Sequence, residues 1–139
     1  MVAIPRGDYD GFCEDPDPRY PIVLIYGPNR GLVSERIETL LKNVRGKSAD
    51  DFTVVTLDGD ALASDPGKLS DEANTIGLFG DKRVLHIRAG GRSFVDGLKP
   101  LLSGPALETF IAIEAGDLAK NSPLRTVCEA AKNAAAIPC

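Results

Sequence analysis

The sequence predicts a three-layer α/β domain built on a five-stranded, mostly parallel sheet. Strand-like and helix-like segments alternate along the chain from residue 21 onward. The strand-like segments are short apolar runs, as expected where helices cover both faces of a parallel sheet. The chain has 139 residues, enough for one such domain.

Five segments are predicted to be strands, and each is apolar or rich in β-branched residues. In chain order they cover residues 22–26, 52–57, 83–88, 109–114 and 135–139. The chain stops on the last of these. Because a natural protein seldom ends on a core strand, we expect 21–139 to be one domain of a longer protein. Residues 1–20 are predicted to be irregular, with Tyr9 and Phe12 pinning one short turn to the body.

The helix after the first strand has the clearest pattern. Its apolar residues recur at helical spacing, and charged residues occupy the opposite face. We expect it to end near Gly46. The apolar positions are Val33, Ile37, Leu40, Leu41 and Val44.

Three further helices are expected between the later strands. The first of these begins at Pro66, because proline suits the first helical turn. Another is capped by Ser93 and meets Pro100, which should bend or restart it. The last begins at Ser122 and Pro123, a favourable N-cap and first-turn pair.

Composition and charge exclude several classes of function. The net charge is −4 and the pI is about 5.0, so direct DNA binding by this domain is not favoured. No run of eighteen apolar residues occurs, and we expect a cytoplasmic protein without a membrane partner. Cys13, Cys128 and Cys139 lack metal-binding spacing and are expected to be free thiols, so no metal is expected.

The turn after the first strand resembles a phosphate-binding loop that has lost its essential residues. The strand–glycine–helix layout is the one in which backbone N–H groups hold phosphates. Counted from Gly27, however, the position of the essential lysine is Val33. If the loop bound a nucleotide, Gly27, Gly31 and Ser34 would make the contacts. We expect this degenerate loop to be non-functional.

A second loss points the same way. Active nucleotide hydrolases of this class place acidic residues at the end of a later strand to hold Mg²⁺. Here the third strand ends in Arg88, Ala89 and Gly90. We therefore expect no catalytic residues, no cofactor and no ATP hydrolysis. A nucleotide-binding P-loop NTPase or kinase-like domain is the alternative.

Three polar residues are catalytic candidates. Glu114 and Asp117 follow the fourth strand and have the composition of an acid/base pair, but the pattern favours ordinary loop acids. His86 is the only histidine; it lies in mid-strand and is expected to be structural.

Leu78 and Phe79 form a large apolar pair bracketed by Gly77 and Gly80. One interpretation places both side chains in the core before the third strand. The other is an exposed wedge that inserts into a partner's pocket, since aromatic and aliphatic anchors dominate interface energies.

Six motifs follow one another in a characteristic order and spacing. They are VLIYGPNRGLVSER (23–36), VTLDGD (55–60), DEANTIGLFGDKR (71–83), EAGDL (114–118), SPLR (122–125) and NAAAIPC (133–139). Together they resemble the delta subunit of the bacterial DNA polymerase III clamp loader, and the resemblance covers nearly everything from residue 20 onward.

This resemblance implies an AAA+-like domain that has lost ATPase function and belongs to the DNA polymerase III holoenzyme, a DNA-directed DNA polymerase. It implies that Leu78 and Phe79 enter a hydrophobic pocket on the sliding clamp (the beta subunit) and help to open it during DNA replication. The AAA+ lid and the C-terminal collar, which contacts the other loader subunits, would lie outside this chain. Contact with DNA would be indirect.

Overall fold

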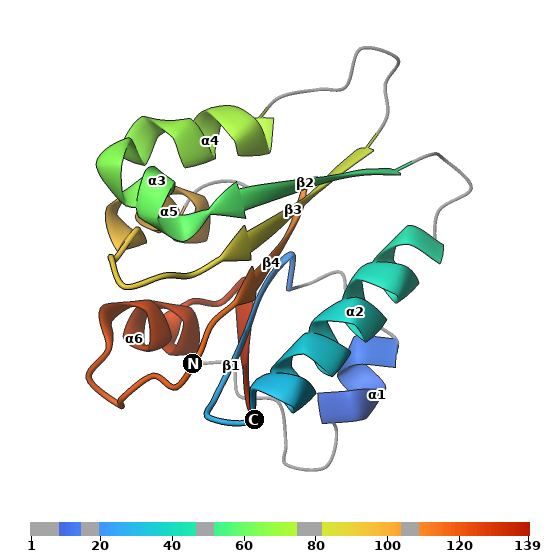
Figure 1. Cartoon of the computed structure of the whole chain (residues 1–139). Coiled ribbons are helices and arrows are strands. Elements are labelled where there is room, and N and C mark those ends of the chain that lie inside the picture. Colours follow the sequence, from blue (N-terminus) through green and yellow to red (C-terminus); the bar gives the residue numbers. More distant parts are fainter. Residues whose placement is uncertain (1–8, 15–19, 47–51, 75–81, 104–108) are drawn as a thin grey trace.

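The computed structural model describes residues 9–14, 20–46, 52–74, 82–103 and 109–139. One sheet contains β1 (Ile22–Tyr26), β2 (Phe52–Asp58), β3 (Lys82–Arg88), β4 (Phe110–Glu114) and β5 (Ala134–Pro138). The strand order is β2-β3-β4-β1-β5, and all four pairings are parallel (Figure 1). The predicted sheet is confirmed, and each strand differs from its predicted bounds by at most one residue at either end.

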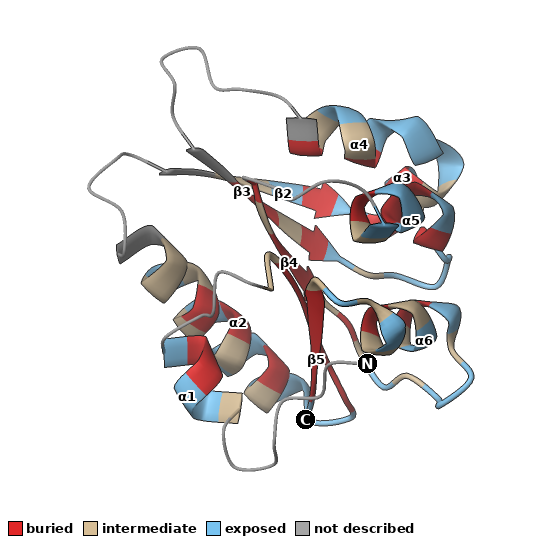
Figure 2. Cartoon of the chain, turned by 180° about the vertical axis from the view of Figure 1, so that it is seen from behind, coloured by how far each residue is buried: buried red, intermediate tan, exposed pale blue. Residues whose placement is uncertain are grey.

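Helices cover both faces of this sheet and complete the three layers (Figures 1 and 2). One face carries α1 (Tyr9–Glu14) and α2 (Arg30–Gly46). The other carries α3 (Gly59–Ser64), α4 (Pro66–Asn74), α5 (Val95–Ser103) and α6 (Pro123–Ala130). Crossovers between parallel strands are almost always right-handed. The connection from β1 to β2 crosses the sheet in one direction, whereas the connections from β2 to β3, β3 to β4 and β4 to β5 cross it in the other direction. The helix α2 of the first connection therefore lies on the face opposite to the helices of the later ones.

The strand β1 is the centre of the core, and all five of its residues are buried. Its side chains alternate between two clusters, as the pleat requires. Val23 and Ile25 pack in the cluster that contains the apolar face of α2. Ile22, Leu24 and Tyr26 pack in the cluster that contains the helices of the other face.

The helix positions agree with the sequence pattern, with three differences. The helix α3 was not predicted; it begins because the side chain of Asp58 accepts a hydrogen bond from Asp60 N at 3.0 Å. The hydroxyl of Ser122 makes no capping hydrogen bond, although α6 does begin at Pro123. The helix α5 continues through Pro100 and is not restarted there.

Within the interval 1–20, predicted to be irregular, the structure contains the short helix α1. Phe12 is buried against α2, as the predicted short turn requires. Two polar contacts fix α1 to the same helix: Arg36 Nε lies 3.1 Å from the carboxylate of Asp10, and Asn43 Nδ2 donates to Cys13 O at 3.3 Å. A combination of apolar burial and specific hydrogen bonds therefore sets the position of α1.

Asp60 connects the loop after β3 to α3. Its carboxylate accepts the backbone N–H of Arg92 at 2.9 Å, while the guanidinium of Arg92 donates to the hydroxyl of Ser64 at 2.6 Å. A Cβ at Gly90 would lie 2.5 Å from the same carboxylate, so the loop packs directly on it. Asp60, in the VTLDGD motif, thus determines how the chain leaves β3.

We predict that Asp60→Ala lowers the free energy of unfolding by about 1–1.5 kcal/mol, because it removes the hydrogen bond between the Asp60 carboxylate and the exposed Arg92 N–H. Chemical denaturation of both proteins measures the difference. Asp96→Ala is the matched control, since Asp96 is an exposed acid in the first turn of α5; it should change stability by about 0.5 kcal/mol or less. Equal effects of the two substitutions would contradict the assigned role of Asp60.

Candidate functional site

The topology creates a crevice at the carboxyl edge of the sheet, between β1 and β4. The chain leaves β1 toward α2 on one face and leaves β4 toward α6 on the other. In open parallel sheets, ligand sites form where neighbouring strands connect to opposite faces in this way. The structure has a pocket of about 230 Å³ at this point.

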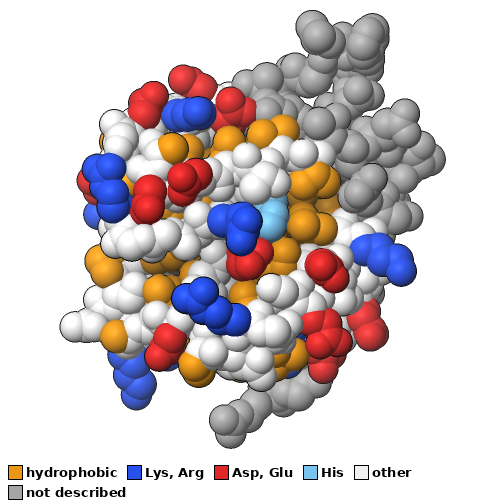
Figure 3. Space-filling view, viewed as in Figure 1, with side chains coloured by type: hydrophobic (Ala, Val, Ile, Leu, Met, Phe, Trp, Pro, Cys, Tyr) orange, Lys and Arg blue, Asp and Glu red, His pale blue; other side chains and the backbone are white. Residues whose placement is uncertain are grey.

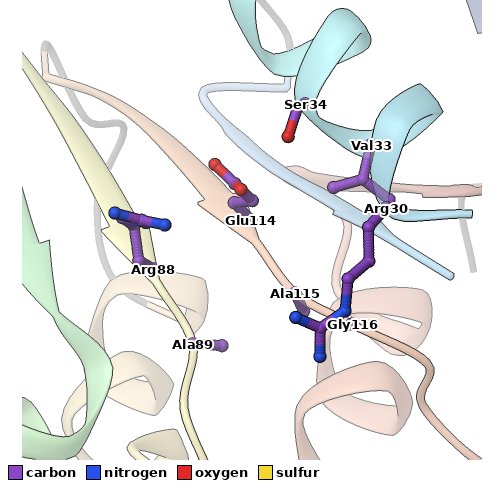
Figure 4. A pocket seen from close by; sticks show the side chains of 8 residues that line it. All are labelled: Arg30, Val33, Ser34, Arg88, Ala89, Glu114, Ala115 and Gly116. Carbon is purple, nitrogen blue, oxygen red and sulfur yellow. The ribbon is translucent and has the colours of Figure 1, made fainter. Parts of the chain in front are cut away.

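Residues from three elements line the pocket (Figure 4). Arg30, Val33 and Ser34 belong to the first turns of α2. Arg88 and Ala89 come from the end of β3, and Glu114, Ala115 and Gly116 from the end of β4. The parallel register places Arg88 directly beside Glu114.

Glu114 is engaged by His86. The Nε2 atom of His86 lies 2.9 Å from Oε1 of Glu114, and the two side chains are 14% and 22% exposed. The residues are diagonal neighbours on one face of β3 and β4. Figure 3 shows the histidine at the surface beside a cationic and an acidic side chain. His86 is thus the hydrogen-bond partner of Glu114, and its structural role stays a prediction.

Several backbone N–H groups of the turn after β1 make hydrogen bonds within the chain. Gly27 N donates to Gly116 O at 3.0 Å, and Arg30 N donates to Pro28 O at 3.1 Å. Asn29 caps α2, because its side chain accepts from Leu32 N at 3.1 Å and its carbonyl accepts from Val33 N at 3.0 Å. Pro28 has no N–H to offer. These donors are therefore unavailable to a phosphate.

Gly27 is required for packing. Its φ is +147°, a conformation that side chains disfavour. A Cβ at this position would lie 2.6–2.9 Å from the backbone of Cys139, whose N–H donates to Tyr26 O at 2.7 Å. Gly31, in contrast, lies in the exposed first turn of α2, where an added Cβ would meet only the Asn29 side chain at 3.7 Å.

The structure separates the candidate residues predicted from the sequence. Ser34 lines the pocket, whereas Gly27 and Gly31 do not. Asp117 is exposed and is not among the lining residues, so Glu114 acts with His86 and not with Asp117. The predicted clamp-binding residues Leu78 and Phe79 lie outside the described part of the chain.

The sequence analysis missed Arg30 as a pocket residue and did not connect Arg88 with Glu114. A signal was available, because parallel strands end at one edge of a sheet and Arg88 and Glu114 both end predicted strands. The adjacency of β3 and β4 was the missing information. Arg30 could not be located in this way, since its direction depends on where α2 begins.

The motif at 122–125 stabilises the loop that follows the pocket. Arg125 Nη1 donates to Leu118 O at 3.2 Å, and its guanidinium lies 5.2 Å from the centre of the Tyr26 ring. Its Nε also lies 2.5 Å from the carboxylate of Glu129. Burial raises the pKa of Tyr26, and the nearby Arg125 partly opposes the shift. Arg125 thus links β1, α6 and the loop after β4.

The three cysteines are free, and two are deeply buried. Burial raises the pKa of Cys13 to about 11 and that of Cys128 to about 12, so both remain protonated thiols at neutral pH. Among the described residues, no group of three His, Cys, Asp or Glu side chains is arranged to hold a metal ion. Within the same part of the chain, no helix is long and apolar enough to cross a bilayer.

Comparison with solved structures supports the α/β fold. Trip13 from Rhizobiales matches with a TM-score of 0.55 and 17% sequence identity, covering 86% of this chain and 45% of that chain. A chain of the E. coli MS115-1 HORMA:CdnC:Trip13 complex matches with a TM-score of 0.53 and 15% identity, covering 86% and 44%. This chain therefore spans less than half the length of those proteins. No curated protein matches the sequence.

A family comparison identifies the relationship more closely. Residues 23–93 match the family described as DNA polymerase III, delta subunit. This match spans slightly more than half of the chain. The chain belongs to the delta subunit family of DNA polymerase III, as the sequence motifs had indicated, and this membership is consistent with a clamp-loader role in DNA replication.

We predict opposite effects for the two glycines of the degenerate loop. Gly27→Ala should lower the free energy of unfolding by at least about 1–3 kcal/mol, because it forces an unfavourable backbone conformation and a clash. Gly31→Ala should raise it by up to about 1 kcal/mol, because alanine is the better helix former. Thermal and denaturant unfolding of the two variants measures both changes. A stable Gly27→Ala protein would show that the turn is not the constraint described above.

Proposed function

We propose that this domain is the clamp-binding module of a delta subunit, which opens the DNA polymerase III sliding clamp without hydrolysing ATP. In this proposal residues 21–139 are the AAA+-like domain of a longer chain. Leu78 and Phe79 form the wedge that enters a hydrophobic pocket of the clamp. The observation that carries the proposal is the family match, since residues 23–93 include both this pair and the degenerate loop.

The fold supports this proposal by anchoring both ends of the segment that holds the wedge. Residues 75–81 connect α4 with β3. At one end, Ala73 is buried, and its carbonyl accepts a hydrogen bond at 2.8 Å from the buried hydroxyl of Thr109. At the other end, β3 pairs with both β2 and β4. A rigid base at both ends reduces the ordering cost of binding, and more interaction energy then remains for the clamp.

Loss of hydrolysis agrees with the chemistry of the pocket. The position of the phosphate-binding lysine is the buried Val33, and four backbone N–H groups, those of Gly27, Arg30, Leu32 and Val33, are used internally. Arg88 ends β3 where an active enzyme would need an acidic residue, and the nearby Glu114 is held by His86. A P-loop NTPase or kinase-like activity has no comparable support.

The proposed mechanism is a shift in the clamp's conformational equilibrium. A wedge that fits the open or strained clamp interface better than the closed one favours opening by the difference between the two binding free energies. No covalent step is involved. The hydrolysing subunits of the loader would use ATP to expose this surface.

We predict that Leu78→Ala and Phe79→Ala each weaken clamp binding by roughly tenfold or more, as for central interface anchors, while the melting temperature changes little. Surface plasmon resonance with a purified bacterial beta clamp measures the binding, and calorimetry measures the stability. If the two side chains belonged to the core, each substitution would cost roughly 2–5 kcal/mol.

Leu118→Ala is the matched control. Leu118 is a half-buried apolar residue packed against the core, so its truncation should reduce stability slightly and leave clamp binding unchanged. Clamp binding that survives both wedge substitutions would exclude the proposed role of Leu78 and Phe79.

We also predict that the domain releases no phosphate from Mg²⁺–ATP and has no micromolar affinity for it. The reason is that neither a lysine nor a metal-holding carboxylate is present where catalysis requires them. Isothermal titration and a phosphate-release assay provide the measurements. Micromolar binding with turnover would favour the alternative of an active P-loop NTPase.

A further inference from the structure

We propose that the pocket at the carboxyl edge of the sheet binds a small phosphate anion, such as pyrophosphate, through the side chains of Arg30 and Arg88. This inference does not depend on clamp binding, because it concerns a different surface and different residues.

Both arginines are available to a ligand. Each is exposed and lines the pocket, and within the part of the chain that the structure describes, neither guanidinium has an ion-pair or hydrogen-bond partner. Arg30 comes from α2 and Arg88 from the end of β3, so they approach the pocket from different elements (Figure 4). The Nη2 atom of Arg30 would lie 3.9 Å from a Cβ at Gly116, which places this guanidinium over the floor of the pocket.

The charge balance of the pocket favours an anion. Among the described lining residues Glu114 is the one acid, and its carboxylate lies 2.9 Å from His86 Nε2. The two arginines outnumber this single carboxylate, so the lining carries a net positive charge. Guanidinium–phosphate contacts are among the stronger charge-assisted hydrogen bonds. The hydroxyl of Ser34 adds one neutral donor at the same rim.

The remaining lining residues limit the size of the ligand. They are Val33, Ala89, Ala115 and Gly116, and no aromatic side chain is present among the lining residues. A nucleotide base normally needs an apolar or aromatic surface to stack on. The pocket therefore fits a phosphate group or a short phosphate chain, and it offers little to a base.

Duplex DNA is not the expected source of the phosphate. The chain carries a net charge of −4, and cationic and acidic side chains are interspersed on the face seen in Figure 3. An extended polyanion would meet these carboxylates, whereas a small anion contacts only the pocket.

The test is an NMR titration of the 139-residue chain with sodium pyrophosphate in the absence of Mg²⁺. We expect saturable shifts centred on Arg30, Ser34 and Arg88, with a dissociation constant on the order of 1 mM. Arg30→Gln and Arg88→Gln should each weaken binding by about fivefold or more, the loss expected for one charge-assisted contact. Glu114→Gln should strengthen it, since it removes the opposing charge and retains a partner for His86.

Lys99→Gln is the matched control, because Lys99 is an exposed cation on α5, on the opposite face of the sheet; it should leave the affinity unchanged. ATP without Mg²⁺ should bind about as well as pyrophosphate, and adenosine should not bind. The proposal is overturned if pyrophosphate causes no saturable shifts. It is also overturned if the two arginine variants bind pyrophosphate as tightly as the Lys99→Gln control, or if a short DNA duplex binds more tightly than pyrophosphate. Clamp binding by the arginine variants, measured in parallel, should remain intact.

Discussion

The burial of β1 is the constraint on which the rest of the structure depends. This strand pairs with β4 on one edge and β5 on the other, and all its residues are buried. The chain must therefore leave the sheet sharply at its carboxyl end. Gly27 provides that exit: its conformation suits glycine, its N–H pairs with Gly116, and its missing side chain admits the backbone of Cys139. The glycine is thus explained by packing, without any nucleotide.

The same turn has the strand–glycine–helix layout of a phosphate loop but uses several of its donors within the chain. In a functional loop the N–H groups are left open for phosphate oxygens. Here the side chain and the carbonyl of Asn29 take two of these groups, and α2 begins at Arg30. Val33, at the position of the lysine, is buried in the cluster beneath α2. The loop is therefore a capped connection between β1 and α2.

The sequence predicted the sheet and the helix α2 well because both depend on local patterns. Short apolar runs define the strands, and the spacing of residues such as Ile37 and Leu40 defines the buried side of α2. The pocket was less accessible to this reasoning. His86 and Glu114 are far apart in sequence, and only the order and register of β3 and β4 make them neighbours. The helix α3 was also missed, because it has only six residues and begins at a polar cap. Such a short helix lacks the apolar periodicity that reveals longer helices.

For the proposed clamp-opening role, the position of the proposed wedge segment in this topology matters more than the chemistry of the pocket at the carboxyl edge. Residues 75–81 enter β3, an inner strand that pairs with β2 and β4. A load applied to this segment is therefore transmitted to a sheet whose centre is fully buried, and separating β3 would break two parallel pairings at once. A domain that opens a ring must deform less than the ring does. In this proposal the five-stranded sheet meets that requirement, because its central strand is buried and β3 is paired on both edges.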